Sequence, residues 1–408
     1  MPKLLQINAS VNTGSTGRIA EEIGQRAIVA GYESYIAYGR TARESQSNVI
    51  KIGSKWNVRL HGIVSLFFDA HGFASKCATR KFIKQVETIK PDVILFHNLH
   101  GYYLNIEVLL TYLKDKDISV FWTLHDCWPF TGHCSYFDAY NCGRWKTHCE
   151  RCPNQKGYPK SLLVDRSRSN FDKKKSLLTG LSNVTFIPVC KWMGHIVEDS
   201  FMKGRPHQVI YNGTNIDVFK PQDEEIISRI IREHEITGEK IIIGVASTWD
   251  KRKGLLDFEW LKGQLPDEFQ IVLVGLSEEQ IKGLPKGIIG IRKTESVQEL
   301  SALYSIADVF VNPTYVDNFP TTNIEALACG TPVITYNTGG SPEAIDENTG
   351  IVVAKGDKEA LKKAIIEVVS NKGKYTSGAC RKRAVENFNK DDRFGDYIAL
   401  FNQALKAK

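Results

Sequence analysis

The sequence predicts an α/β protein of two doubly wound domains, each with a parallel sheet covered by helices on both faces. Short apolar runs of strand length alternate with amphipathic stretches of helical period, which is the pattern of strands joined by crossover helices. The same alternation begins again in the second half of the 408 residues, without a sequence repeat. A chain of this length is expected to hold about two domains, since one domain takes roughly 100–200 residues.

The expected strands are short apolar runs bounded by turn residues. In the first half they are 4–9, 34–38, 92–97, 119–124 and 184–189. In the second half they are 209–211, 241–246, 270–274, 288–291, 308–312 and 332–335. Apolar residues recur at helical spacing after the first strand, near 297–306 and near 323–328. This spacing predicts the helices that link the parallel strands.

The domain boundary is expected near Lys203-Gly204-Arg205-Pro206, a polar segment between the two patterns. This divides the chain into an N-terminal domain over 1–203 and a C-terminal domain over 204–390. The segment 391–408 reads as an amphipathic helix that packs back across the domains. Ligands of open α/β sheets bind at the carboxyl ends of the strands, so a central cleft that both domains face is the expected site.

The composition is that of a soluble globular protein, with 42% hydrophobic and 24% charged residues. No apolar stretch approaches the ~20 residues of a membrane span, and the N-terminus does not resemble a signal peptide, so a cytoplasmic location is expected. The net charge of +7 is uneven, with +10 over residues 1–190 and −3 over the rest. The basic half indicates either an anionic partner, such as phosphates or a membrane surface, or an ordinary solvated surface.

Two segments follow expected strands where phosphate groups are commonly bound. Gly14-Ser15-Thr16-Gly17 joins the first strand to a helix, and small residues let backbone N–H groups approach an anion. It is not the Gly-x-Gly-x-x-Gly fingerprint of dinucleotide binding. Ser247 and the basic triplet Lys251-Arg252-Lys253 follow the strand at 241–246, where a cation could meet a phosphate.

A third segment frames a loop and a short helix with two carboxylates, Asp317 and Glu325, eight positions apart. It continues through Ala328-Cys329-Gly330-Thr331-Pro332-Val333 to Gly339-Gly340 and Glu343. Carboxylates at a strand end suit sugar hydroxyls, which need hydrogen-bond acceptors.

These residues resemble the donor-binding signature of the family-four retaining glycosyltransferases of GT-B type. That family has a carboxylate, seven residues, a glutamate, an Ala-x-Gly-x-Pro-Val run, and a Gly-Gly with a following Glu. The resemblance covers nearly the whole chain and extends to several further positions: Gly14 and Gly17, His125, Asn212-Gly213 and Lys253-Gly254. It implies two Rossmann-like domains and an acceptor-side N-terminal domain.

The resemblance also implies roles for individual residues. Lys253, with Arg252 and the backbone near Gly339 and Gly340, would stabilise charge on the leaving diphosphate. Glu325 would accept hydrogen bonds from ribose hydroxyls. Asp317 would hold hydroxyls of the transferred sugar. His125 would line the cleft beside that sugar. The remaining donor contacts fall at Gly14, Gly17, Ser247, Asn318 and Phe319.

The chain departs from the family pattern at two places. The arginine that usually precedes the lysine by six residues is Ser247, and Arg252 is the expected substitute. The usual glutamate of the carboxylate pair is Asp317, and Pro320 stands where the family has glycine, which removes a backbone donor. No Asp-x-Asp motif follows a strand, so no catalytic metal is expected.

A cysteine-rich insertion spans 127–153 and holds Cys134, Cys142, Cys149 and Cys152, with a Cys-x-x-Cys pair at its end. Four thiolates can bind one structural zinc ion, and two close ligands favour the site. Free thiols or a redox pair are the alternatives. A disulfide scaffold is not expected in a large cytoplasmic chain.

The expected function is that of a metal-independent hexosyltransferase. It would transfer a sugar from a UDP- or GDP-sugar to a saccharide or lipid-linked acceptor in bacterial surface polysaccharide synthesis. The basic N-terminal domain could then contact the inner face of the cytoplasmic membrane as a peripheral membrane protein. One alternative is a sugar-nucleotide epimerase of the same fold. The other is a zinc-dependent nucleic-acid binder, but the chain has no recognition-helix or RNA motif, so no nucleic acid is expected as a partner.

Overall fold

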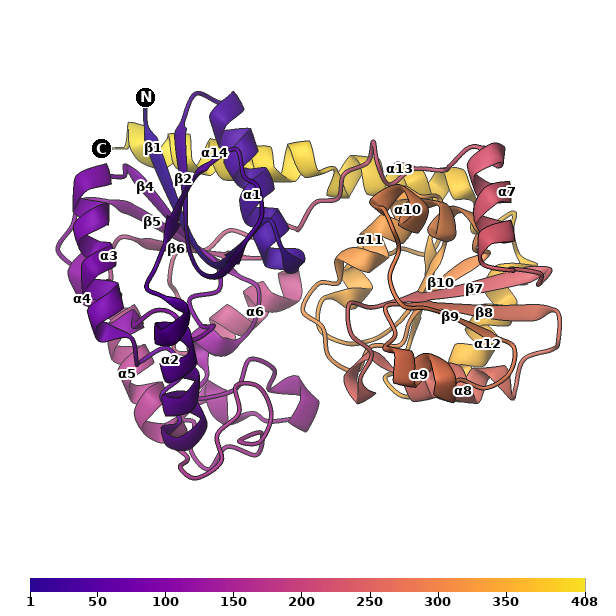
Figure 1. Cartoon of the computed structure of the whole chain (residues 1–408), viewed down its shortest axis with the longest axis horizontal. Helices are drawn as coiled ribbons and strands as arrows, with labels where there is room; N and C mark the ends of the chain where they lie inside the picture. Colours follow the sequence, from indigo (N-terminus) through magenta and orange to yellow (C-terminus); the bar gives the residue numbers. More distant parts are fainter. Residues whose placement is uncertain (408) are drawn as a thin grey trace. The chain divides into compact units, whose positions relative to one another are not determined.

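The computed structural model describes residues 1–407 and divides into two compact units. Unit 1 comprises Met1–Tyr211 together with the segment from Arg393, and unit 2 comprises Asn212–Asp392. The division therefore falls at Tyr211, eight residues after the end of the domain expected over 1–203. Figure 1 shows that each unit is a twisted sheet covered by helices on both faces.

The sheet of unit 1 has six parallel strands in the order β3-β2-β1-β4-β5-β6. Its strands are β1 (Lys3–Val11), β2 (Glu33–Ala42), β3 (Asn48–Lys51), β4 (Val93–Phe96), β5 (Ser119–Leu124) and β6 (Val184–Pro188). Its helices are α1 (Gly14–Val29), α2 (Lys55–Phe68), α3 (Lys76–Ile89), α4 (Ile106–Leu113), α5 (Ser167–Thr179) and α6 (Lys191–Asp199). Side chains on both faces of β1 are buried from Leu4 to Asn8, as expected for a parallel sheet that is covered on both sides.

Unit 2 repeats this architecture with the order β12-β11-β10-β7-β8-β9. Its strands are β7 (Lys240–Val245), β8 (Phe269–Val274), β9 (Ile288–Ile291), β10 (Val309–Asn312), β11 (Val333–Tyr336) and β12 (Gly350–Val353). Its helices are α7 (Glu224–Glu233), α8 (Leu255–Lys262), α9 (Glu278–Gly283), α10 (Val297–Ile306), α11 (Thr321–Ala328), α12 (Lys358–Ser370) and α13 (Ser377–Phe388). The prediction of two doubly wound parallel sheets is confirmed.

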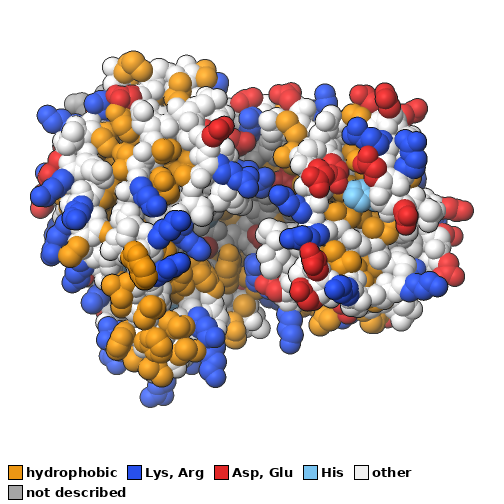
Figure 2. All heavy atoms as spheres, viewed as in Figure 1, with side chains coloured by type: hydrophobic (Ala, Val, Ile, Leu, Met, Phe, Trp, Pro, Cys, Tyr) orange, Lys and Arg blue, Asp and Glu red, His pale blue; other side chains and the backbone are white. Residues whose placement is uncertain are grey.

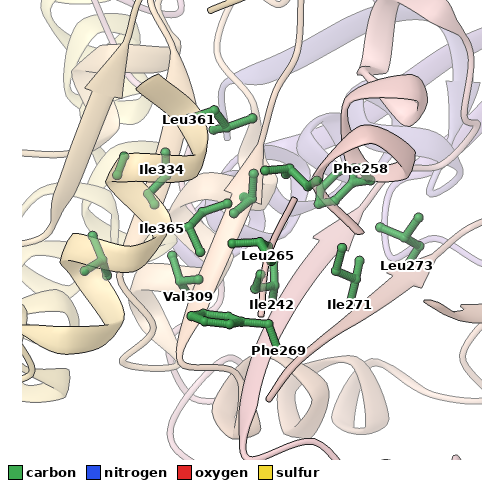
Figure 3. Close-up of a cluster of buried hydrophobic side chains, with 14 of the residues drawn as sticks. Ile242, Phe258, Leu265, Phe269, Ile271, Leu273, Val309, Ile334, Leu361 and Ile365 are labelled. Atoms are coloured by element: carbon green, nitrogen blue, oxygen red, sulfur yellow. The ribbon is translucent and has the colours of Figure 1, made fainter. Parts of the chain in front are cut away.

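The core of unit 2 lies between its sheet and the helices α8 and α12. Ile242, Ile271 and Val309 from three strands meet Phe258 of α8 and Ile365 of α12. Figure 3 shows these side chains converging from the sheet and the helices. This packing holds the strands in register, so their carboxyl ends form one continuous edge.

The C-terminal helix α14 (Lys390–Lys406) belongs to unit 1 from Arg393 onward, although it follows unit 2 in the sequence. Phe394, Tyr397 and Phe401 are buried in one cluster with Leu4 and Ile23 of β1 and α1. This apolar face is the one that the sequence predicted, and the structure shows what it covers.

Three strand predictions differ from the structure. Residues 209–211 are not a strand, because Ile210 makes a single backbone hydrogen bond to Pro188 at the end of β6 and the chain then leaves the sheet. The edge strands β3 and β12 were not predicted. Each is only four residues long and pairs on one side, so it carries little periodicity.

Candidate active site

The topological switch point of unit 2 lies between β7 and β10. These strands pair in parallel, with Val309 beside Ile242, and the chain winds outward from them in opposite directions. The loops that follow the two strands therefore diverge at the carboxyl edge, which is where open α/β sheets bind ligands. The basic loop 247–254 follows β7, and the loop 313–320 follows β10.

An ion pair joins these two loops. Lys253 Nζ lies 2.5 Å from Asp317 Oδ2, and both side chains are about four-fifths buried (20% and 19% exposed). Gly254 has a φ of +76°, and a Cβ there would lie 2.3 Å from the carbonyl oxygen of Pro313. Only glycine permits this approach of the two loops, and it places Lys253 beside the carboxylate.

Arg252 points toward the same loop. Its Nη1 donates to the carbonyl oxygen of Val316 at 3.4 Å, and its Nε lies 3.7 Å from Asp250 Oδ2. Ser247, the position where the family pattern has an arginine, is exposed at the end of β7. The structure thus brings two cations, Arg252 and Lys253, to the β10 loop.

A third loop, after β11, packs against the same segment. Gly339 has a φ of +54°, and a Cβ there would lie 1.8 Å from the carbonyl oxygen of Asp317. Gly340 N donates to the carbonyl oxygen of Asn318 at 2.9 Å, so this N–H group already has a partner. The Phe319 side chain is buried and packs on Phe388, with ring centroids 5.7 Å apart, so it anchors the loop.

Glu325 lies on α11, which follows this loop. The residue is 9% exposed, and Tyr304 Oη donates to its Oε2 at 3.3 Å. A buried carboxylate of this kind is oriented by its donor and can accept further hydrogen bonds from hydroxyl groups.

Sequence reasoning missed a buried polar network that fixes these loops. Asn312 Nδ2 donates to Asn323 Oδ1 at 2.7 Å, and Asn323 Nδ2 donates to Ser341 Oγ at 3.0 Å. Ser341 in turn shares a 2.6 Å hydrogen bond with Thr335. The network ties β10, α11 and β11 together. Polar residues inside otherwise apolar strands, such as Asn312 and Thr335, were its only sequence signal.

The switch point of unit 1 lies between β1 and β4. Gly14 begins α1 directly after β1, and Asn12 N donates to the carbonyl oxygen of Gly17 at 2.9 Å, which closes the predicted turn. The Thr13 side chain does not cap the helix. The glycines thus lie at the carboxyl edge of their sheet, the edge at which His125 follows β5.

His125 takes part in a chain of hydrogen bonds that determines its tautomer. Gln6 Nε2 donates to the carbonyl oxygen of Ala20 at 2.8 Å, so Gln6 Oε1 faces His97 Nε2 and accepts from it at 2.9 Å. His97 Nδ1 is then the acceptor, and His125 Nε2 donates a hydrogen bond to it at 3.0 Å. His125 is left with Nδ1 as its lone-pair nitrogen. No local sequence pattern pointed to Gln6 or His97 in this role.

A second buried pair lies next to His125. His100 Nε2 lies 2.6 Å from Asp126 Oδ2, and Trp128 N donates to Asp126 Oδ1 at 2.9 Å. Burial raises the pKa of Asp126, but the charge of His100 and these hydrogen bonds outweigh it and hold the pKa below its usual value. His100, Asp126 and Trp128 line one small cavity with His97 and His125. Sequence reasoning did not find His100 or Asp126.

The four cysteines of the insertion converge on one cavity. Cys134, Cys142, Cys149 and Cys152 all line it, together with His133. The insertion is held by aromatic packing, in which the ring centroid of Trp145 lies 4.6 Å from that of Phe137 and 5.6 Å from that of Phe130.

The thiols of this cavity differ in acidity. Burial raises the pKa of Cys149 to about 12, whereas the hydrogen bond with Cys134 and the charge of His133 lower the pKa of Cys152 to about 7. No group of three or more His, Cys, Asp or Glu side chains within residues 1–407 is arranged to hold a metal ion. The thiols are therefore gathered but do not form a coordination sphere.

Comparison with known proteins finds similarity to glycosyltransferases. Residues 227–388 match the sequence model of the family described as "Glycosyl transferases group 1". The chain is 26% identical over 370 residues to a putative colanic acid biosynthesis glycosyl transferase of Escherichia coli (strain K12), covering 86% of this chain and 87% of that protein. It is 32% identical over 113 residues to a capsular polysaccharide biosynthesis glycosyltransferase of Staphylococcus aureus, covering 27% and 30%.

Solved structures show the same fold. A sucrose-phosphate synthase from Thermosynechococcus elongatus superposes with a TM-score of 0.75 at 19% identity, covering 100% of both chains. The Anabaena protein HepE, solved in complex with UDP-glucose, gives a TM-score of 0.65 at 15% identity, also over 100% of both chains. The fold and the donor-binding signature define a GT-B glycosyltransferase.

Within that class, residues 227–388 match the group 1 glycosyltransferases, and the chain as a whole is similar to a putative bacterial glycosyl transferase. Metal-independent catalysis is typical of GT-B enzymes. No helix among residues 1–407 has the length and apolar character that crossing a membrane requires.

The histidine pair predicts how stability depends on pH. Burial lowers the pKa of His125 to about 4 and that of His97 well below its usual value. The unfolded chain binds protons as the pH falls below about 6.5, whereas the folded chain does not, so acid destabilises the fold. We expect the free energy of unfolding to fall between pH 6.5 and about 4, and to fall less in His97→Gln.

Urea unfolding followed by tryptophan fluorescence at several pH values measures this effect. His195→Gln is the matched control, since His195 is exposed on α6 and its loss removes no buried imidazole. An unchanged pH slope in His97→Gln would show that the pair does not stay neutral.

Proposed function

We propose that the protein transfers a hexose from a nucleoside-diphosphate-sugar, UDP- or GDP-linked, to a saccharide or lipid-linked acceptor of bacterial surface polysaccharide synthesis, with retention at the anomeric carbon. The observation that carries the proposal is the meeting of Lys253, Asp317 and Arg252 at the switch point of unit 2, with Glu325 on the adjoining helix. The polysaccharide names of the Escherichia coli and Staphylococcus aureus relatives support the pathway. The solved complex of HepE with UDP-glucose supports the donor class.

The diphosphate of the donor would compete with Asp317 for Lys253. In the structure the Lys253 charge is neutralised by the Asp317 carboxylate at 2.5 Å. A bound diphosphate would take over the ammonium group and leave Asp317 to accept hydrogen bonds from hydroxyls of the sugar. Glu325, oriented by Tyr304, would accept from the ribose hydroxyls.

Catalysis would follow from charge that develops on the leaving diphosphate as the bond to the anomeric carbon breaks. Lys253 stabilises that charge most strongly in the transition state, and Arg252 supports it from the same side of the loop. Because these two cations meet the diphosphate, no divalent metal is needed for this step.

His125 would contact the transferred sugar. The hydrogen bonds of the Gln6–His97–His125 chain point the Nε2–H group of His125 at His97 and so fix the orientation of the His125 ring. With a pKa of about 4, His125 stays neutral near pH 7 and acts by positioning rather than by charge.

We also propose that Cys134, Cys142, Cys149 and Cys152 hold one structural zinc ion. All four thiols line one cavity, and the chain around them has only short 3₁₀ turns at Asp138–Tyr140 and Arg144–Lys146. Binding would draw the thiolates into a tetrahedron and order this irregular segment.

A panel of nucleotide-sugars scored by thermal shift tests the donor assignment. The true donor should raise Tm by mass action, and Glu325→Ala should weaken its binding about tenfold or more, because a charge-assisted hydrogen bond is lost. Glu347→Ala, at an exposed glutamate of unit 2, should leave binding unchanged.

The same preparations test the reaction. Donor and acceptor together should yield a glycoside, and a brief EDTA treatment should not reduce its rate. Formation of an epimer from the donor alone would overturn the transferase assignment in favour of the epimerase.

The role of Lys253 is tested by steady-state kinetics. Lys253→Ala should lower kcat by roughly 10²–10³ and change KM much less, since the lost interaction belongs to the transition state. Arg252→Ala should lower kcat by a smaller factor, and Lys251→Ala, at the exposed neighbour, should have no effect. A rise in KM alone in Lys253→Ala would contradict the transition-state role.

Elemental analysis of anaerobically purified protein tests the zinc proposal. About one equivalent of zinc is expected, and Cys152→Ser should release it and reduce transfer while sparing donor binding, because none of the four ligands lies in unit 2. Cys77→Ser, at an exposed thiol outside the cavity, should retain the metal. Protein without metal would leave the cluster as free thiols.

A further inference from the structure

Helix α2 presents its apolar side to solvent. Trp56, Leu60, Ile63 and Phe67 recur at the spacing of one helical stripe, and their exposed fractions are 74%, 60%, 53% and 37%. A surface helix ordinarily turns such a stripe toward the core. In α2 the apolar stripe faces solvent instead.

The inner face of α2 is polar and firmly anchored. His61 and Ser65 are its buried residues. His61 Nδ1 lies 2.8 Å from Ser75 Oγ, and Gly72 N donates to His61 Nε2 at 3.3 Å. These bonds fix the rotation of the helix, so the apolar stripe cannot turn inward.

A neighbouring loop enlarges the apolar surface. Leu162 N donates to the carbonyl oxygen of Leu66 at 2.7 Å, which joins residues 158–163 to the end of α2. Tyr158, Leu162 and Leu163 are 41%, 46% and 71% exposed. We call the exposed stripe of α2 (Trp56, Leu60, Ile63 and Phe67) and these three residues the apolar patch. Figure 2 shows it as a broad hydrophobic area on unit 1 bordered by Lys and Arg side chains.

The charges around the apolar patch are of one sign. The chain from Lys51 to Phe68 carries Lys51, Lys55 and Arg59 and no acidic residue, and the same holds from Arg151 to Lys160, with Arg151, Lys156 and Lys160. Arg59 lies over the Trp56 ring, 5.2 Å from its centroid. Aromatic and aliphatic side chains flanked by cations are the composition of a helix that lies in the interface of an anionic bilayer.

We propose that the apolar patch docks unit 1 onto an anionic lipid bilayer, with Trp56, Leu60, Ile63 and Phe67 inserted among the acyl chains near the headgroups. The flanking cations would meet the lipid phosphates. A second copy of this chain would face the patch with like charges, which disfavours a symmetric dimer. The fixed, convex stripe therefore fits a lipid surface better than another copy.

The patch adjoins the histidine cluster of unit 1, and this part of the inference rests on the proposed function. Tyr158 Oη lies 3.2 Å from His100 Nδ1, and His100 pairs with Asp126, the residue after His125. Docking through the apolar patch would place the bilayer surface near His125, because Tyr158 of the patch contacts His100 and His100 contacts Asp126. A lipid-linked acceptor could then reach the site while its lipid stays in the membrane.

Co-sedimentation of the full-length protein with vesicles tests the proposal without donor or acceptor. Binding is expected to vesicles that contain phosphatidylglycerol, to weaken with salt, and to be weak on phosphatidylcholine alone. The double variant Trp56→Ser/Ile63→Ser should bind about a hundredfold more weakly, because each lost side chain contributes roughly a factor of ten. Leu256→Ser/Val297→Ser, at exposed apolar positions of unit 2, is the matched control and should bind as before.

Two further measurements keep the outcomes distinct. Transfer to a water-soluble saccharide acceptor should be unchanged in Trp56→Ser/Ile63→Ser, whereas transfer to a lipid-linked acceptor in vesicles should fall. Absence of vesicle binding by the unaltered protein would overturn the docking proposal even where transfer to the water-soluble acceptor persists. A dimer in solution that the double variant dissociates, without vesicle binding, would assign the patch to a second copy instead.

Discussion

The carboxyl edges of the two parallel sheets determine where the loops of the candidate site lie. Both faces of each sheet are covered, so most strand residues are apolar, and the buried polar ones, such as Gln6 and Asn312, take part in hydrogen bonds. The other polar side chains of the candidate site follow the strands, near the reversals of strand order at β1/β4 and β7/β10. In unit 2 the loops after β7 and β10 pack against each other where Gly254 meets Pro313, and there Lys253 and Asp317, 64 residues apart in the sequence, form an ion pair.

Close backbone contact rather than side-chain attraction brings the loops of unit 2 together. Gly254 lies against Pro313 and Gly339 against Asp317 at distances that leave no room for a Cβ. The buried network of Asn312, Asn323 and Ser341 then satisfies the polar groups that this packing encloses. These contacts fix the loop backbone that carries Lys253 and Asp317, which is the arrangement that the proposed electrostatic catalysis requires.

In unit 1, burial lowers the pKa of two histidines, His97 and His125. Burial keeps the imidazoles of His97 and His125 neutral, and their hydrogen bonds with Gln6 and with each other assign a single tautomer to each. Nearby, α2 is held by polar contacts and turns its apolar stripe outward. Both features run against the usual distribution of polar and apolar residues, and such departures are expected where function rather than stability selects the residue.

The sequence by itself determined the fold class and the residue types of the candidate donor site. The alternation of apolar runs and amphipathic stretches specifies two parallel sheets, and the segment from Asp317 to Glu343 carries the resemblance to the family, because both are local patterns. Only the tertiary structure decided that α14 packs in unit 1, that Gln6 and His97 orient His125, and that Lys253 pairs with Asp317. Each of these depends on contacts between residues far apart in the chain, which periodicity and local motifs do not encode.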